Sequence, residues 1–262
     1  GVVKTRSNAL YGDVRYALTP KLTIGGGLRL SRDEKSATEY SVSPIRDITG
    51  TPSGVWNSTP GHVGLEWNLS EDTMVYSKVA HGFKSGAINA GAVQPETVKP
   101  ESVTSVELGA KTSFLDKKGS FSAALFTSSY KDMQLTQIGN LATILGNASQ
   151  AKINGFEMEM LVRPISPLTL GASLGLMDPT YTDFTNEDKN LRSPQVGPIS
   201  LKGNQLPNVS RAQASLNVEW KQAMGAYQTS LSANYVWRDK FYFNEFNTAD
   251  AMQEAYGMLN LA

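Results

Sequence analysis

Two pairs of opposite charges are the residues of this sequence with the clearest potential for chemistry: Glu107 with Lys111, and Glu159 with Arg163. The members of each pair stand four positions apart in a segment that alternates apolar and polar residues. In a β-strand such residues lie on the same face. A carboxylate and a cation on a polar interior face can form ion pairs that satisfy buried charge, or can contact another part of the protein or a ligand. We favour internal ion pairing and keep ligand or domain contact as the alternative.

The sequence offers little for catalysis or for a bound cofactor. It has no cysteine and only two histidines, His62 and His81, which are far apart and not accompanied by clustered carboxylates. Gly25, Gly26 and Gly27 are not a phosphate-binding loop, because no Lys-Ser or Lys-Thr follows them. We expect these glycines to relieve crowding in a curved strand. No serine stands in a motif that would pair it with a base. We therefore predict that the chain is not an enzyme and that it holds no metal or cofactor.

The charged pairs lie in segments with a period of two, which places alternate residues on opposite faces of a sheet. One face collects apolar and small residues, and the other collects Thr, Ser, Gly, Asn and charged residues. The apolar sets include Leu22, Ile24, Gly26, Leu28 and Leu30; Leu168, Leu170, Ala172, Leu174 and Leu176; and Ala212, Ala214, Leu216, Val218 and Trp220.

About eleven strands are predicted, joined alternately by short turns and long polar connections. They lie at about residues 8–18, 22–32, 63–69, 73–84, 105–114, 120–137, 155–163, 168–178, 212–220, 227–237 and from 256 onward. All short turns fall at the same end of the strands, and the longest loop is expected at residues 179–205. The alternation in residues 120–137 is blurred, and the sequence does not assign its faces. Strands of about ten residues with tight turns at one end and long loops at the other are typical of a transmembrane β-barrel.

Composition agrees with a barrel. Charged residues make up 18% of the chain, below the roughly 25% of typical soluble domains. Mean hydropathy is −0.27, and no run of 18 apolar residues could form a transmembrane helix. Lys plus Arg and Asp plus Glu both number 24, so no basic field points to nucleic acid. The predicted fold class is all-β, an antiparallel up-and-down transmembrane barrel.

Several segments, in this order along the chain, carry a resemblance to a known family. They are residues 27–35, residues 75–86 followed by Asn89, the Pro-Glu pairs at 95–96 and 100–101, residues 106–111, residues 126–134, Asn147-Ala148, Gly155-Phe156-Glu157 and the region 164–184. Together they resemble the barrel of TonB-dependent outer-membrane receptors. The resemblance implies a barrel of 22 strands around an N-terminal plug. All of residues 1–262 would then be part of the barrel domain, roughly strands ten to twenty, with the plug and both barrel ends missing.

The resemblance also implies a function and partners. Such receptors lie in the outer membrane of Gram-negative bacteria, surrounded by its lipid, and import large scarce ligands, above all iron-siderophores. They are energised by the TonB complex, here through a part absent from this sequence. Ligand contacts are expected from Lys84 and Asn89, and from Tyr181, Phe184 and Arg192 in the longest loop. Aromatic and Arg side chains there could hold a chelate by stacking and charge.

Two rival interpretations stay open at this stage. A passive porin-like channel would share the alternation and the loop asymmetry, but it would lack the plug and would carry charged rings at a constriction. A soluble all-β binding protein would bury its apolar faces against each other and would not need every long loop at one end. The identity of the ligand cannot be deduced from these residues, because barrels with the same wall carry different cargoes.

Overall fold

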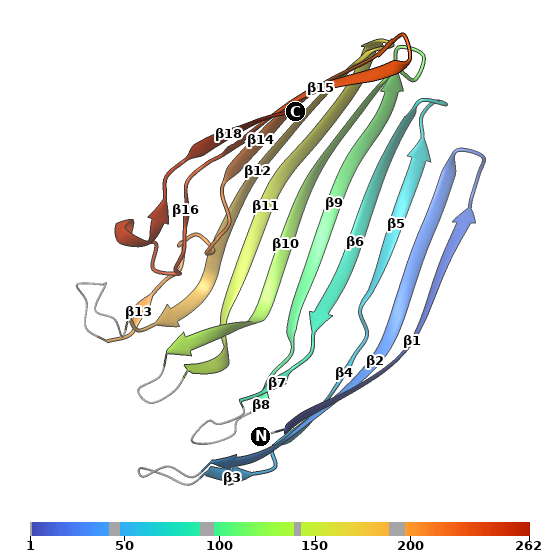
Figure 1. Cartoon of the computed structure of the whole chain (residues 1–262). Helices are drawn as coiled ribbons and strands as arrows, with labels where there is room; N and C mark the ends of the chain where they lie inside the picture. The colour runs from blue at the N-terminus through green and yellow to red at the C-terminus, as the bar shows by residue number, and fades with distance from the viewer. Residues whose placement is uncertain (1, 42–47, 90–96, 139–142, 189–196) are drawn as a thin grey trace.

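The computed structural model describes residues 2–41, 48–89, 97–138, 143–188 and 197–262. They form one large antiparallel sheet whose main strands follow one another in chain order (Figure 1). The main strands are β1 (Val2–Ala17), β2 (Leu22–Ser41), β5 (Gly61–Asn68), β6 (Thr73–Lys84), β9 (Glu101–Phe114), β10 (Gly119–Ile138), β11 (Thr143–Ile165), β12 (Leu168–Asn186), β14 (Ala212–Met224), β15 (Tyr227–Arg238) and β18 (Tyr256–Leu261). The prediction of about eleven strands is confirmed.

Shorter elements lie in the long connections. They are β3 (Ile48–Gly50) and β4 (Ser53–Ser58), both paired with β2; β13 (Ile199–Ser200), paired with β12; the two-stranded ribbons β7 (Ala87–Ile88) with β8 (Thr97–Val98) and β16 (Phe241–Tyr242) with β17 (Met252–Gln253); and the 3-10 helix η1 (Ala249–Ala251). Among the described residues, no helix is long and apolar enough to span a membrane.

The predicted tight turns lie at one end of the sheet, as Figure 1 shows. At the other end the strands are far apart in sequence, except that only residues 139–142 separate β10 from β11. In the turn between β9 and β10, Leu115, Asp116 and Lys117 have positive φ angles, at 53°, 52° and 65°. Gly119 begins β10, and a side chain there would overlap the ring of Phe114. Its role is to leave room for that ring.

The strand register confirms that the apolar sets form one continuous face. Residues directly opposite each other in an antiparallel pair point to the same side. The pairs include Leu10 with Leu30, Ile24 with Leu65, Val79 with Val106, Leu108 with Leu125, and Leu216 with Tyr235. Most of these side chains are exposed, as expected for a surface that lipid covers.

The register also assigns the faces of β10. Phe121, Ala123 and Leu125 pair with the apolar face of β9, whereas Ser122 and Phe126 lie on the polar face. The blurred alternation has two causes. Phe126 is a large apolar residue on the polar side, and the strand bulges between Tyr130 and Met133, where Asp132 has a φ of 53°.

We call the end of the sheet opposite the tight turns the outer end. Several strands extend further toward this end than expected. β12 continues to Asn186, so the expected loop at residues 179–205 was wrong in its first part. β11 begins at Thr143, and β1 begins at Val2. Pairing continues beyond the apolar face because each strand still satisfies the backbone groups of its neighbour.

Candidate functional site

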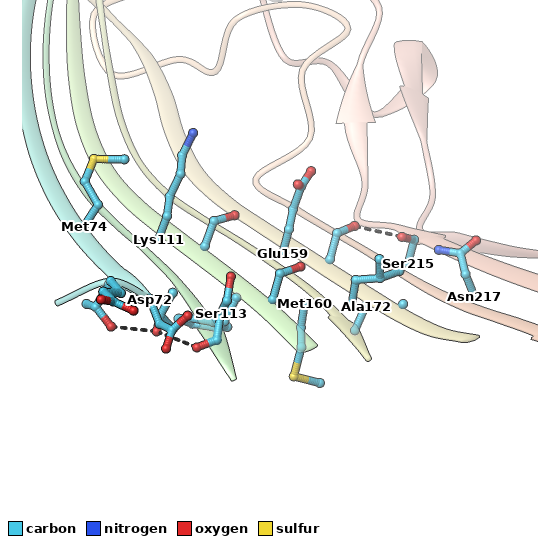
Figure 2. Close-up of a pocket in the computed structure, with 18 of the residues that line it drawn as sticks. Asp72, Met74, Lys111, Ser113, Glu159, Met160, Ala172, Ser215 and Asn217 are labelled. Carbon is cyan, nitrogen blue, oxygen red and sulfur yellow. Dashed lines mark hydrogen bonds between the residues drawn. The ribbon is translucent and has the colours of Figure 1, made fainter. Parts of the chain in front are cut away.

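The polar face of the sheet is hollowed and carries the candidate site. One hollow, of about 700 Å³, is lined by Lys111, Ser122, Glu159, Ser173 and Ser215 among others. Figure 2 shows Lys111 and Glu159 pointing to this side of the sheet and Met160 to the other. The four charged residues that first drew attention to the chain therefore belong to strands that line a concave polar surface.

A second hollow of about 530 Å³ adjoins the first. Among its lining residues, Tyr76, Glu107 and Lys111 form an interacting group. The Tyr76 hydroxyl donates a hydrogen bond to Glu107 Oε1 at 2.6 Å, and Lys111 Nζ lies 5.7 Å from the centre of the Tyr76 ring. The ring lies against Gly109, where a Cβ would come within 2.5 Å of Tyr76 Cε1. Glycine thus lets the ring lie flat on the wall.

Glu107 and Lys111 do not form the expected ion pair. Four residues along a strand span roughly 13 Å, which is far beyond salt-bridge distance. Tyr76 connects them instead, as hydrogen-bond donor to the carboxylate and as an aromatic face for the ammonium group. Within the described part of the chain, Glu159 and Arg163 likewise form no salt bridge with each other. Glu159 lines the larger hollow, and the backbone N–H of Arg163 donates to Lys118 O at 2.7 Å near the short-turn end.

Two polar side-chain contacts on the concave face were not expected from the sequence. Arg15 pairs with Glu66, and His62 Nε2 lies 3.2 Å from Asp13 Oδ2. Both join β1 to β5 across the intervening β2, and Gly27 provides the room for the contact between His62 and Asp13. A Cβ at Gly27 would lie 2.5 Å from Asp13 Oδ2 and 2.8 Å from His62 Cε1. This agrees with the expectation that these glycines relieve crowding, and the glycines were the signal that could have located the contacts.

Of the expected ligand-facing residues, Lys84 and Asn89 lie at the outer end. Lys84 is exposed, and its Nζ is 3.7 Å from Glu101 Oε2. The Asn89 side chain exchanges two hydrogen bonds with the backbone of Leu145, at 2.7 and 2.9 Å, and so joins the end of β7 to β11. Arg192 lies outside the described residues. Ligand contact by these three residues stays a prediction.

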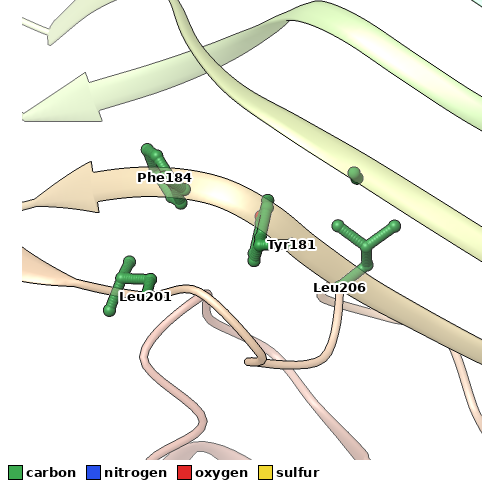
Figure 3. Packing of buried hydrophobic residues seen from close by; sticks show 5 residues of the cluster. Tyr181, Phe184, Leu201 and Leu206 are labelled. Carbon is green, nitrogen blue, oxygen red and sulfur yellow. The ribbon is translucent and has the colours of Figure 1, made fainter.

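Tyr181 and Phe184 were expected in an open loop, and that placement was wrong. Both lie in β12, and their side chains are only 1% and 2% exposed. They pack against Leu201 and Leu206 (Figure 3), with their ring centres 4.8 Å apart. Alternation alone would put residues three apart on opposite faces. A register shift beside Ala151 brings both rings to the same side.

The segment that covers these rings is held by backbone hydrogen bonds to the edge of β12. Tyr181 N–H donates to Asn204 O, and Gly203 N–H donates to Tyr181 O, both at 2.9 Å. Burial, with the nearby Glu245 carboxylate as a second cause, raises the pKa of the Tyr181 hydroxyl well above its ordinary value, so it stays neutral. These rings form a small core, and their burial does not favour direct contact with a ligand.

Amide side chains join the long connections to the sheet and to one another, which the sequence did not indicate. Gln134 Nε2 donates to Ser85 O and Lys99 O, at 2.9 and 3.0 Å. Asn247 is engaged with both backbone groups of Gln205, its Oδ1 accepting at 2.7 Å and its Nδ2 donating at 3.0 Å. The outer connections are therefore linked units. Among the described residues, no group of three His, Cys, Asp or Glu side chains could hold a metal ion.

An antiparallel sheet with an exposed apolar face, a hollowed polar face and a row of tight turns at one end is the wall of an outer-membrane β-barrel. The family described as "TonB dependent receptor-like, beta-barrel" matches residues 1–262, and the chain belongs to this family of Gram-negative outer-membrane receptors.

Known relatives agree with this assignment. The pesticin receptor of Yersinia pestis is 29% identical over 244 residues, which cover 90% of this chain and 34% of that protein. The fold matches the ferric yersiniabactin uptake receptor FyuA from Yersinia pestis with a TM-score of 0.84 at 22% identity, over 99% of this chain and 38% of the other. It also matches the siderophore receptor PiuA from Acinetobacter baumannii with a TM-score of 0.81 at 21% identity, over 99% and 36%. The chain thus spans about a third of the length of these proteins.

Proposed function

We propose that this chain is a wall segment of an outer-membrane receptor that binds and actively imports an iron-siderophore, energised by TonB. The ligand passes through the barrel without chemical change, so the protein acts as a transporter and not as an enzyme. The chain contributes a lipid-facing band, a polar face toward the interior and outer connections that take part in selecting the ligand.

The observation that carries this proposal is the division between the two faces. Apolar side chains recur on one face from β1 to β15, and the opposite face offers charged and hydroxyl groups around two hollows. A passive channel would carry a ring of charged side chains of one sign at its constriction. The charges on this face are of both signs, which suits contact with a polar domain packed inside the barrel better than an open passage. The printed names of the relatives, receptors for pesticin and for ferric siderophores, supply the class of ligand.

Tyr76, Glu107 and Lys111 are the residues that we assign to contact with the plug. Their side chains line the adjoining hollows on the concave face and are already held by one another. A wall that is ordered in this way offers a fixed polar surface to a domain that must rearrange when TonB pulls on it.

Uptake by the complete protein tests the proposal. The full-length receptor would be expressed in a Gram-negative strain that lacks its own siderophore receptors, and iron-55 uptake from a panel of ferric siderophores would be measured with and without TonB. We expect saturable uptake of at least one chelate that disappears without TonB. Uptake that is linear with concentration and independent of TonB would instead establish a passive channel.

A further inference from the structure

A pair of lysines lies on the apolar face of the sheet at the point where that face becomes polar. Lys131 on β10 and Lys152 on β11 are both exposed. We propose that they form a binding site on the outer wall of the barrel for the phosphate groups of an anionic lipid of the outer leaflet. The proposal concerns the lipid around the protein and does not depend on which ligand is imported.

The register places both lysines on the lipid-facing side. Lys152 is directly opposite Ser129. Lys131 is two residues beyond Ser129, at the start of the bulge, and its pairing with Ser102 of β9 places it on that same face. Diagonal neighbours of this kind are separated by roughly 7–8 Å between Cα atoms, within reach of one phosphate group for long side chains. The same face carries Leu125 and Phe156 closer to the tight turns. The lysines therefore continue the lipid-facing surface and do not belong to the interior.

Their height matches the outer boundary of the membrane. The ten residue-to-residue steps from Phe121, beside the tight turn, to Lys131 extend roughly 33 Å along the strand. With the usual strand tilt of about 35–45°, this corresponds to a height of roughly 25 Å, the height of the apolar band of outer-membrane barrels. The long connections lie at this same end, which is the extracellular one. The two ammonium groups thus lie at the level of the outer headgroups.

The charges of the two lysines are available to a ligand. Within the described residues, neither lysine has a salt-bridge partner. Asp178, the carboxylate on the neighbouring strand, is engaged by Arg211 at 3.2 Å. Two further carboxylates lie nearby: Asp132 follows Lys131 at the bulge, and the exposed Asp183 is directly opposite Gln150, two residues from Lys152.

Hydroxyl groups complete the surface. Ser129 and Thr104 are both exposed and are directly opposite each other in the register, next to the lysines. The Thr104 hydroxyl is also hydrogen-bonded to the His81 ring at 3.0 Å, which leaves Ser129 as the freer hydroxyl. Hydroxyl and ammonium donors beside an apolar wall fit a phosphorylated lipid, whose chains lie on the wall while its headgroup accepts hydrogen bonds.

The test compares two double variants of the full-length receptor. Lys131→Gln with Lys152→Gln removes the proposed site. Lys117→Gln with Lys118→Gln removes two exposed lysines in the turn at the opposite end and serves as the matched control. Each detergent-purified protein would be titrated with bis-phosphorylated lipid A, with dephosphorylated lipid A and with inorganic phosphate, and binding would be followed by native mass spectrometry.

For bis-phosphorylated lipid A, we expect the first variant to bind roughly 25-fold more weakly than the native protein at low salt, since each lysine near an anionic surface contributes about fivefold. The control variant should bind like the native protein, and the dephosphorylated lipid should bind all three proteins equally weakly. Retention of the folded state would be checked by the shift in gel mobility on heating. Equal binding by both variants would overturn the proposal, and so would binding of inorganic phosphate as tight as that of the lipid.

Discussion

Two apolar regions of this chain have similar side chains and opposite environments. On the apolar face of the wall, Leu10 is 73% exposed and Leu108 is 59% exposed. At the outer end of the same sheet, Tyr181 and Phe184 are almost completely buried beneath the chain itself. The first region is covered by lipid and the second by the protein. Hydrophobicity alone therefore does not tell where a residue of this chain lies, whereas its height along the strand does.

The two regions should also differ in how they stabilise the fold. In the wall, apolar side chains exchange one apolar neighbour for another, so packing between them adds little, and the backbone hydrogen bonds of the sheet dominate. At the outer end, where water is the alternative, burial of a large side chain contributes about 1.5–3 kcal/mol. The outer cluster should therefore respond to mutation like the core of a soluble protein.

The largest effect is expected for Phe184→Ala. Removing a fully buried aromatic ring leaves a cavity, and the covering segment should lose about 3–5 kcal/mol of stability. Hydrogen exchange of residues 199–210 in the full-length receptor would measure this as faster exchange. Tyr181→Phe is the control, because the Tyr181 hydroxyl has no hydrogen-bond partner among the described residues. It should leave exchange unchanged or slower, and a comparable acceleration in both variants would show that the cluster is not a core.

Leu108→Arg should have the next largest effect. A charged residue facing lipid near the middle of the band costs about 2–4 kcal/mol. Urea unfolding of the receptor in phospholipid vesicles would measure that cost. Leu115→Arg is a close control, since Leu115 is 57% exposed against 59% for Leu108 but lies in a tight turn outside the band. Equal costs at the two positions would mean that Leu108 does not face lipid.

The sequence was sufficient to predict the wall and insufficient to predict the outer cluster, for a physical reason. The period of two persists through most strands, so residues such as Leu28 and Leu216 could be assigned to a face without knowledge of their neighbours. A bulge changes this relation. The shift next to Ala151 brings Tyr181 and Phe184 to one side, and the bulge at Asp132 blurs β10. A bulge is visible only once the partner strand and its register are known.

Contacts between distant residues were unpredictable for the same reason. Tyr76 and Glu107 are 31 positions apart, and only the pairing of β6 with β9 brings them together. The sequence did provide a partial signal, because Gly109 lies on the polar face of its strand directly opposite Tyr76. A glycine opposite an aromatic residue is a known arrangement of paired strands, but it can be recognised only after the strands have been paired.

Tyr76→Phe should have a smaller effect, on the concave face. It keeps the ring over Gly109 and removes the hydrogen bond to Glu107, which is worth about 1.5–3 kcal/mol when the acceptor is charged. The same urea unfolding experiment would measure the loss, and Tyr227→Phe, at a highly exposed tyrosine, is the control. If the two variants were equally stable, the Tyr76 hydroxyl would be well solvated. The interactions of Tyr76 with Glu107 and Lys111 would then not order the wall.

The smallest effect is expected for Arg15→Gln, which removes the contact between Arg15 and Glu66. Both side chains are substantially exposed on the concave face, at 63% and 42%. An exposed ion pair is worth about 1 kcal/mol or less, and salt weakens it further. Urea unfolding of the full-length receptor at low and high salt would measure both quantities. A loss of several kcal/mol that salt does not reduce would contradict this expectation. It would place the pair in a dry environment, so that the concave face would resemble the outer cluster more than a solvated surface.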